Sequence, residues 1–113
     1  MKKIVLLMLL LGVVVYGSTG EEIAKKSDCL HCHAMDKRSI APAFLGIARH
    51  NIRLNPKDPR SKMIHVIKYG SHGEYRHYKS KTMPPHPNLS DKEINTLVSW
   101  ILDSYKDYMA HNQ

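Results

Sequence analysis

Apolar residues recur at helical spacing over the last third of the chain, directly after the sequence Ser90-Asp91-Lys92-Glu93. That sequence is a Ser-x-x-Glu capping box, in which two side chains satisfy backbone N–H groups at the start of a helix. The pattern predicts an amphipathic helix that runs to about Tyr108 and buries one face, with Trp100 at its flank. The apolar positions are Ile94, Leu97, Val98, Ile101, Leu102 and Tyr105.

Shorter helices are expected earlier in the chain. Thr19 and Glu22 form a second capping box, and the helix that they begin is predicted to continue into the segment 29–33. Another short helix is predicted over 44–48. The polar stretch 49–60 contains two prolines and is interpreted as a loop.

A further helix is indicated between Asp58-Pro59 and Gly70. Aspartate followed by proline is typical of a helix start, and glycine after the last apolar position is typical of a helix end. Met63 and Ile67 lie at helical spacing between these limits. Met63 is therefore expected in the core rather than on a metal.

The remaining segments have no helical or strand-like period, and the chain contains no internal repeat. The segment Thr82–Pro87 holds three prolines in four positions. Proline cannot donate a backbone hydrogen bond, so this segment is predicted to be a stiff, extended loop. The pattern as a whole predicts an all-α fold of about four short helices.

The first residues have the pattern of a secretory signal peptide. Lys2 and Lys3 precede an apolar run over 4–16, and small residues follow at 17–20. The run is shorter than the ~20 residues that cross a bilayer. Residues 1–17 are therefore predicted to be a signal peptide, although cleavage as late as Gly20 also fits the pattern, and residues 18–113 to form a single domain.

The chain is basic, with 17 Lys and Arg residues against 10 Asp and Glu residues. Such a surface favours acidic partners and accelerates encounters with them. Predicted export and the absence of a basic-aromatic reader motif disfavour nucleic acid. Four lysines, each in a polar stretch, are candidates for the docking face: Lys37, Lys57, Lys79 and Lys81.

The sequence Cys29-Leu30-His31-Cys32-His33 carries the candidate chemistry. Two cysteines at i and i+3 lie on one face of a helical turn, where each thiol can add to one vinyl group of a haem. A histidine directly after the second cysteine can reach the iron. This spacing is the attachment pattern of c-type haem.

Two other uses of the cysteines are less consistent with the sequence. A thiol-disulfide centre would be expected next to a βαβ pattern, which the sequence lacks. A structural zinc site would need two further ligands at metal-ligand spacing, and no such pair follows the cysteines at the usual distance.

The proline-rich segment offers a second iron ligand. Met83 stands at the base of this stiff loop, where its thioether is presented rather than packed, and His86 is the second candidate. A histidine ligand usually donates its other ring N–H to a fixed acceptor. The carbonyl of Pro42 is a candidate acceptor for His33, and an ordinary turn proline is the alternative.

Taken together, these residues resemble the class I monohaem cytochromes c of bacteria, in particular the small cytochromes c-551 and c-552, also called cytochrome c8. The resemblance covers about Glu21 to Lys106. Beyond the attachment motif, the matching elements are Pro42-Ala43-Phe44, Lys68-Tyr69-Gly70-Ser71-His72-Gly73, Met83-Pro84-Pro85 and Trp100.

The resemblance implies one haem c in a small cytochrome c fold wrapped around it. It implies thioethers at Cys29 and Cys32, axial ligands His33 and Met83, and the Pro42 carbonyl behind His33. The chain departs from the family in the loop 74–82, which lacks the tryptophan that supports a haem propionate. Tyr75 is its candidate substitute.

The resemblance also implies a function. The protein is expected to be an exported periplasmic carrier and not an enzyme. This carrier is expected to move single electrons between respiratory partners with acidic docking faces. It is expected to be a monomer, without stable membrane insertion after signal cleavage. The competing hypothesis is a haem sensor or catalyst in which Met83 is labile and the iron binds a gas or peroxide. A third is a zinc or thiol-redox module.

Overall fold

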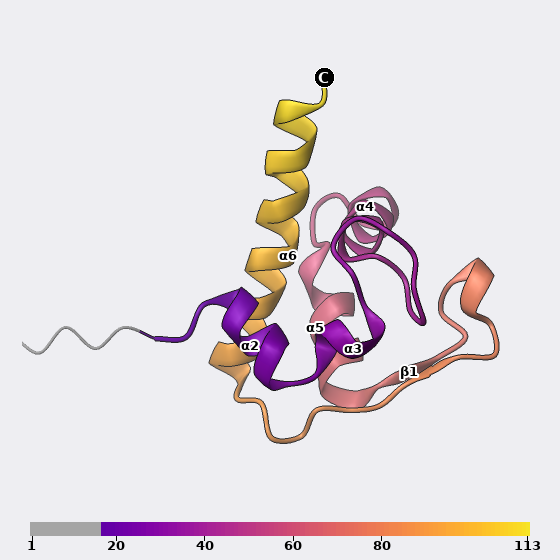
Figure 1. Ribbon diagram of the computed structural model, residues 1–113, viewed down its shortest axis with the longest axis vertical. Helices are drawn as coiled ribbons and strands as arrows, with labels where there is room; N and C mark the ends of the chain where they lie inside the picture. Colours follow the sequence, from indigo (N-terminus) through magenta and orange to yellow (C-terminus); the bar gives the residue numbers. More distant parts are fainter. Residues whose placement is uncertain (1–16) are drawn as a thin grey trace, which may run out of the picture.

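The computed structural model describes residues 17–113, so most of the predicted signal peptide lies outside the described residues. Figure 1 shows one long helix with shorter helices and a two-stranded hairpin beside it. Within residues 17–113, none of the helices combines the length and apolar character needed to cross a membrane. The elements are α2 (Gly20–Lys26), α3 (Cys29–Cys32), α4 (Phe44–Leu54), α5 (Arg60–Tyr69), β1 (Ser71–His72), the 3-10 helix η2 (Arg76–Tyr78), β2 (Thr82–Met83) and α6 (Asp91–His111).

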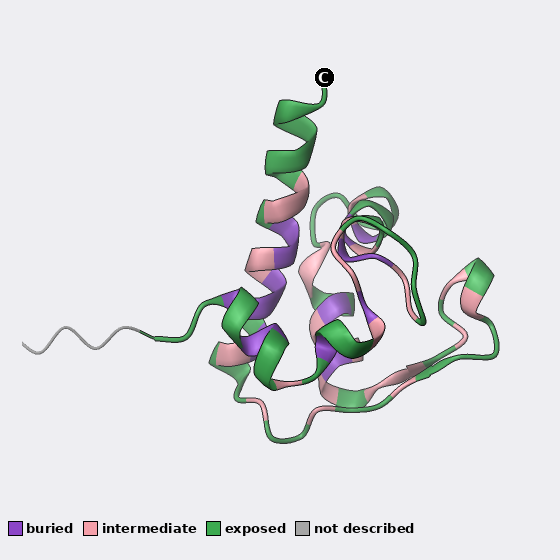
Figure 2. Cartoon of the chain, viewed as in Figure 1, coloured by how far each residue is buried: buried purple, intermediate pink, exposed green. Residues whose placement is uncertain are grey.

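The long helix α6 is the frame on which the other helices pack. Its predicted capping box is present, because Ser90 Oγ accepts from Glu93 N at 3.1 Å and Glu93 Oε1 accepts from Ser90 N at 3.2 Å. α2, α4 and α5 all contact it. Figure 2 shows the buried residues where these helices meet and the exposed last turns of α6. The predicted helical core is therefore confirmed.

The amino-terminal helix α2 crosses α6 at very short range. Its predicted capping box is present, with Glu22 N donating to Thr19 Oγ1 at 3.2 Å. Gly20 is buried, and a Cβ at this position would overlap the side chain of Trp100. Only glycine allows the two helices to approach this closely. The predicted packing of the last helix across the first is confirmed.

The prediction that the first helix continues through residues 29–33 is wrong. α2 ends at Lys26, and α3 is a separate helix that begins at Cys29. Asp28 between them has φ 58°, in the left-handed region. Aspartate is one of the few residues other than glycine that adopt this conformation readily. The sharp turn sets the direction of α3 independently of α2.

The prediction of a loop directly after Ala48 is also wrong, because α4 extends to Leu54. The helix continues because Asn51 extends the buried face at helical spacing. Only 4% of the Asn51 surface is exposed. Asp58 behaves as expected near the start of α5, since its Oδ1 accepts from Ser61 N at 3.1 Å. Met63 is in the core, as predicted, with 4% exposed.

A short antiparallel pairing joins β1 and β2, and the sequence analysis did not predict it. Ser71 pairs with Met83, and His72 with Thr82. Gly70 ends α5 with φ 79°, and a Cβ there would lie 2.6 Å from Met83 O. The glycine therefore permits both the helix end and the close approach of the second strand.

Replacing Gly20 tests the close contact between α2 and α6. Gly20→Ala is expected to lower the free energy of unfolding by about 1–3 kcal/mol, because the added methyl group overfills a packed contact. Gly46→Ala is the matched control, since a Cβ at this exposed helical position meets nothing within 4 Å. It is expected to raise stability by about 0.5–1 kcal/mol. Urea unfolding of both variants measures these changes in the free energy of unfolding. Equal changes in the two variants would contradict the close contact between Gly20 and Trp100.

A second test uses the ion pair between Lys26 and Glu93, which joins α2 to α6. Hydrogen bonds from Lys26 and from the Ser90 backbone lower the pKa of Glu93. A lowered folded-state pKa stabilises the fold above the unfolded pKa, and this contribution disappears as the pH falls through the folded value. Glu93→Gln keeps the capping box but removes the charge.

The stability difference between wild type and Glu93→Gln should therefore be largest near neutral pH and shrink as the pH falls from about 5 to 3. Urea midpoints over a pH series measure it. Asp103→Asn, on the exposed side of the same helix, should show no comparable trend. A difference that stays constant with pH would exclude the ion pair as its cause.

Candidate functional site

The two cysteines lie one helical turn apart on α3. Cys29 is buried, Cys32 is half-buried, and both thiols are free. His33 directly follows the helix, and its backbone N–H donates to Cys29 O at 2.9 Å. The single turn thus holds both thiols and the imidazole in one small region, as the spacing predicts.

The imidazole of His33 is held by a backbone carbonyl. Its Nδ1 lies 2.7 Å from Pro42 O, the contact anticipated from the sequence. A carbonyl oxygen only accepts, so Nδ1 must carry the proton and Nε2 keeps its lone pair. His33 is 8% exposed, and burial lowers its pKa, which favours this neutral form. A neutral imidazole with a free Nε2 lone pair is a metal ligand.

The segment after α3 folds back to hold Pro42 in place. Ala41 N donates to Cys32 O at 2.9 Å, and Phe44 N donates to Ala34 O at 2.9 Å. The Phe44 ring then stacks on the His33 ring with centroids 5.0 Å apart. The loop, the carbonyl and the aromatic ring together fix the orientation of the imidazole.

The loop that carries Met83 is fixed at both ends. The β1–β2 pairing holds Met83 itself, and farther along His86 N donates to Ile67 O at 3.0 Å. Met83 is half-buried and packs against the core. His86 also lies near enough for its charge to lower the pKa of His33. The β1–β2 pairing and the bond to Ile67 hold this loop against the end of α5 and the strand that follows it.

The other methionines in the described chain are worse placed. Met63 belongs to the core, and Met109 lies 37% exposed near the end of α6. Met35 packs against the core close to the attachment turn. Met83 stays the candidate predicted from the sequence, in a loop that the β1–β2 pairing holds.

The donor set fits a haem better than the two other uses of the cysteines. Two thiols on one turn, a neutral imidazole and a thioether are the groups that hold a haem c. Among residues 17–113, no three His, Cys, Asp or Glu side chains cluster closely enough to hold a metal ion. Burial raises the pKa of the Cys29 thiol, whereas redox-active cysteines have a lowered pKa.

A buried polar contact beside this site was missed in the sequence analysis. Asn51 Nδ2 donates to Ile47 O at 2.8 Å and to Tyr75 Oη at 3.5 Å. Tyr75 also packs on His50, with ring centroids 4.8 Å apart. Asn51 follows Phe44 and Ala48 at helical spacing, and this was the signal that could have revealed it.

Comparison with known proteins agrees with this site. The cytochrome c family matches residues 18–104. Cytochrome c-552 of Nitrosomonas europaea is 31% identical over 90 residues, which cover 80% of this chain and 82% of the relative. Cytochrome c-551 of Pseudomonas denitrificans is 34% identical over 88 residues, which cover 75% of this chain and 96% of the relative.

The fold agrees as well. The crystal structure of Nitrosomonas europaea cytochrome c552 superposes with a TM-score of 0.63 at 31% identity, over 74% of this chain and 96% of that chain. Proteins of this kind carry electrons and hold one haem c by covalent bonds. The chain belongs to the cytochrome c family, as a class I c-type cytochrome of the c-551/c-552 group.

Proposed function

We propose that this protein is an exported monohaem electron carrier that moves single electrons between respiratory partners in the periplasm. Haem c supplies a one-electron iron couple when bound. In this proposal Cys29 and Cys32 form the thioethers, and His33 and Met83 are the axial ligands. The observation that carries it is the hydrogen bond from His33 Nδ1 to Pro42 O at 2.7 Å, which leaves Nε2 free.

A carrier needs both ligands to stay bound in both oxidation states. His33 meets this need because Pro42 and Phe44 fix its ring before any metal binds. Met83 meets it because its own backbone is held in the β1–β2 pairing and the chain is held again at His86, whose N–H donates to Ile67 O. A ligand on a rigid support loses little entropy on binding, so a free coordination position is disfavoured. This supports electron transfer over gas or peroxide chemistry.

The proposal of export rests on the sequence of residues 1–17, and the described residues bear on where processing occurs. Thr19 caps α2, and Gly20 is buried against Trp100. Gly17 and Ser18 are exposed and lie before the first helix. Cleavage after Gly20 would remove the cap and place a positive α-amino group at a helix start, where positive charge is unfavourable. We therefore favour cleavage after Gly17.

Replacing Met83 tests the ligand set. Met83→Ala is expected to abolish the sulfur-to-iron charge-transfer band of the oxidised protein, because the thioether is removed. The reduced variant should then bind carbon monoxide, whereas the wild type should not. Met109→Ala, at an exposed methionine, should leave both properties unchanged. Visible spectra with and without carbon monoxide measure this.

Two results would contradict this assignment. A high-spin wild-type spectrum, or carbon monoxide binding by the unmodified protein, would favour the sensor or catalytic hypothesis. A band that survives in Met83→Ala would exclude Met83 as the ligand, and His86→Ala would then identify whether His86 binds instead.

The amino terminus of the exported holoprotein tests the processing site. Intact mass and amino-terminal sequencing should show a chain that starts at Ser18. A chain that starts at Glu21 would contradict the argument from the capping box. A chain that retains Met1 would contradict removal of the signal peptide altogether.

A further inference from the structure

Positive charge is unevenly distributed along the chain. Residues 37–81 contain eleven Lys and Arg residues and only two acidic residues. The helices α2 and α6 together contain six acidic and four basic residues. The middle of the chain is therefore strongly basic, whereas the two crossed helices are slightly acidic.

The basic residues of α5 are already engaged within the fold. Lys62 pairs with Glu74 at 3.2 Å, and Lys68 pairs with Asp91 at 2.9 Å. Arg60 donates to Ser99 Oγ at 2.9 Å and to the backbone of α6. These contacts join α5 to its neighbours, and the carboxylates of Glu74 and Asp91 offset part of its positive charge.

Most of the remaining cations gather on one face. They come from three segments: the loop after α3, the exposed side of α4, and the turn between β1 and β2. Each is exposed, and none has an ion-pair partner within residues 17–113. We call this set the α4–hairpin face, and it consists of Lys37, Arg38, Arg49, Arg53, Arg76, Lys79 and Lys81.

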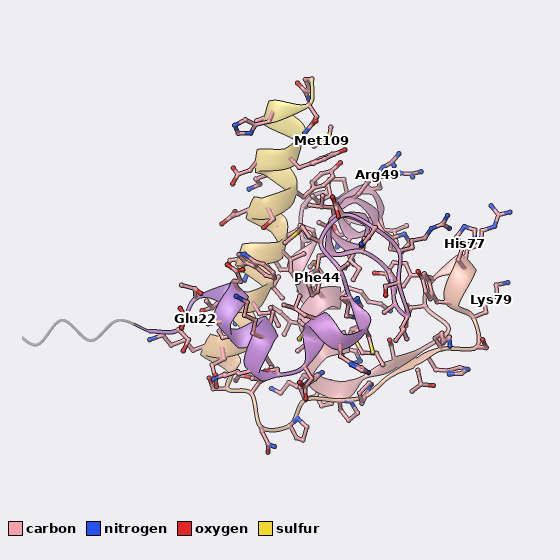
Figure 3. All side chains as sticks on the ribbon, in the orientation of Figure 1. Glu22, Phe44, Arg49, His77, Lys79 and Met109 are labelled. Carbon is pink, nitrogen blue, oxygen red and sulfur yellow. The ribbon has the colours of Figure 1, made fainter. Side chains whose placement is uncertain are left out.

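Contacts between the three segments make this a single surface. Tyr78 Oη donates to Ser39 O at 3.3 Å, which joins the hairpin turn to the loop after α3. Tyr75 packs on His50 of α4 with ring centroids 4.8 Å apart. Figure 3 shows Arg49 and Lys79 extending on the side of the molecule away from α6. Two tyrosines thus join the three segments that carry the cations.

The sequence analysis identified this face only in part. Lys37, Lys79 and Lys81 belong to it, but Lys57 lies in the separate loop between α4 and α5. Arg49 and Arg53 were missed because residues 49–60 were interpreted as a loop. An α-helix instead places Arg49 and Arg53 one turn apart on the same side.

We propose that the α4–hairpin face docks an acidic protein surface. This rests on the proposed function, since the partner is then a redox protein. Arginine forks pair with carboxylates through two parallel hydrogen bonds, and fixed positive charge accelerates encounters with an acidic surface. Two acidic residues belong to these segments: Glu74, which pairs with Lys62, and Asp36, which directly precedes Lys37. Ile40, 50% exposed beside Arg38, supplies an apolar contact.

A protein surface fits this face better than a lipid surface does. Helices that lie on membranes keep an apolar face free to enter the headgroup layer. α4 has no such face, because Phe44 and Ala48 are buried in the core. The face is also built from three segments in a set geometry, which suits recognition of specific carboxylates.

The test measures binding of a fluorescent oligoglutamate peptide of about ten residues to the haem-containing protein at low salt. Two double variants reverse the same amount of charge. Arg49→Glu with Arg76→Glu changes the α4–hairpin face, and Lys92→Glu with Lys106→Glu changes α6. The first is expected to weaken binding about tenfold or more, and the second by less than about twofold. Lys79→Glu with Lys81→Glu repeats the first test in one segment.

Binding by the wild type should weaken steeply as the salt rises to about 0.3 M. Equal losses in both double variants, or no dependence on salt, would overturn the proposal. Tighter binding to phosphatidylglycerol vesicles than to the peptide, lost in the same variants, would assign the face to lipid instead. The wild-type visible spectrum separates the two proposals, because a wild-type spectrum without the signature of His/Met ligation would contradict the proposed ligand set, whereas the peptide titration tests the docking face alone.

Discussion

The site depends above all on the hydrogen bond between His33 and the carbonyl of Pro42. Pro42 lies outside any helix or strand, so its carbonyl is free to accept from His33. This carbonyl in turn decides which imidazole nitrogen carries the proton. Every other contact around His33 serves this geometry, from the backbone bonds that hold the loop to the stacked ring of Phe44. Ligand orientation is therefore settled by the polypeptide and not by the metal alone.

The same loop links the site to the stability of the whole fold. Phe44 contacts His33 on one side and the edge of Trp100 on the other, with ring centroids 5.5 Å apart. Trp100 in turn packs against Gly20, where α2 crosses α6. A chain of direct contacts thus runs from the crossed helices to the imidazole. A change in the packing of α2 on α6 would therefore be transmitted to His33 through only two aromatic rings, those of Trp100 and Phe44.

The sequence predicted the parts of the structure that depend on local chemistry. Both capping boxes, the buried stripe of α6 and the end of α5 at Gly70 follow from residue type and spacing. The contact of His33 with Pro42 was one of two alternatives that the residues left open, and the resemblance implied it. The failures arose where tertiary contacts decide. Asn51 continues α4 because it is buried against Tyr75, and β2 pairs with β1 because Gly70 lets the chains approach. Neither partner is near in sequence.

The distribution of charge differs between the crossed helices and the segments around the site. One ion pair, between Lys26 and Glu93, joins the crossed helices α2 and α6. The loops and α4 enclose the site and carry cations with no internal partner in the described chain. Like charges held close together raise the energy of the free protein. In our proposal an acidic partner relieves that repulsion when it binds the side of the molecule beside the site.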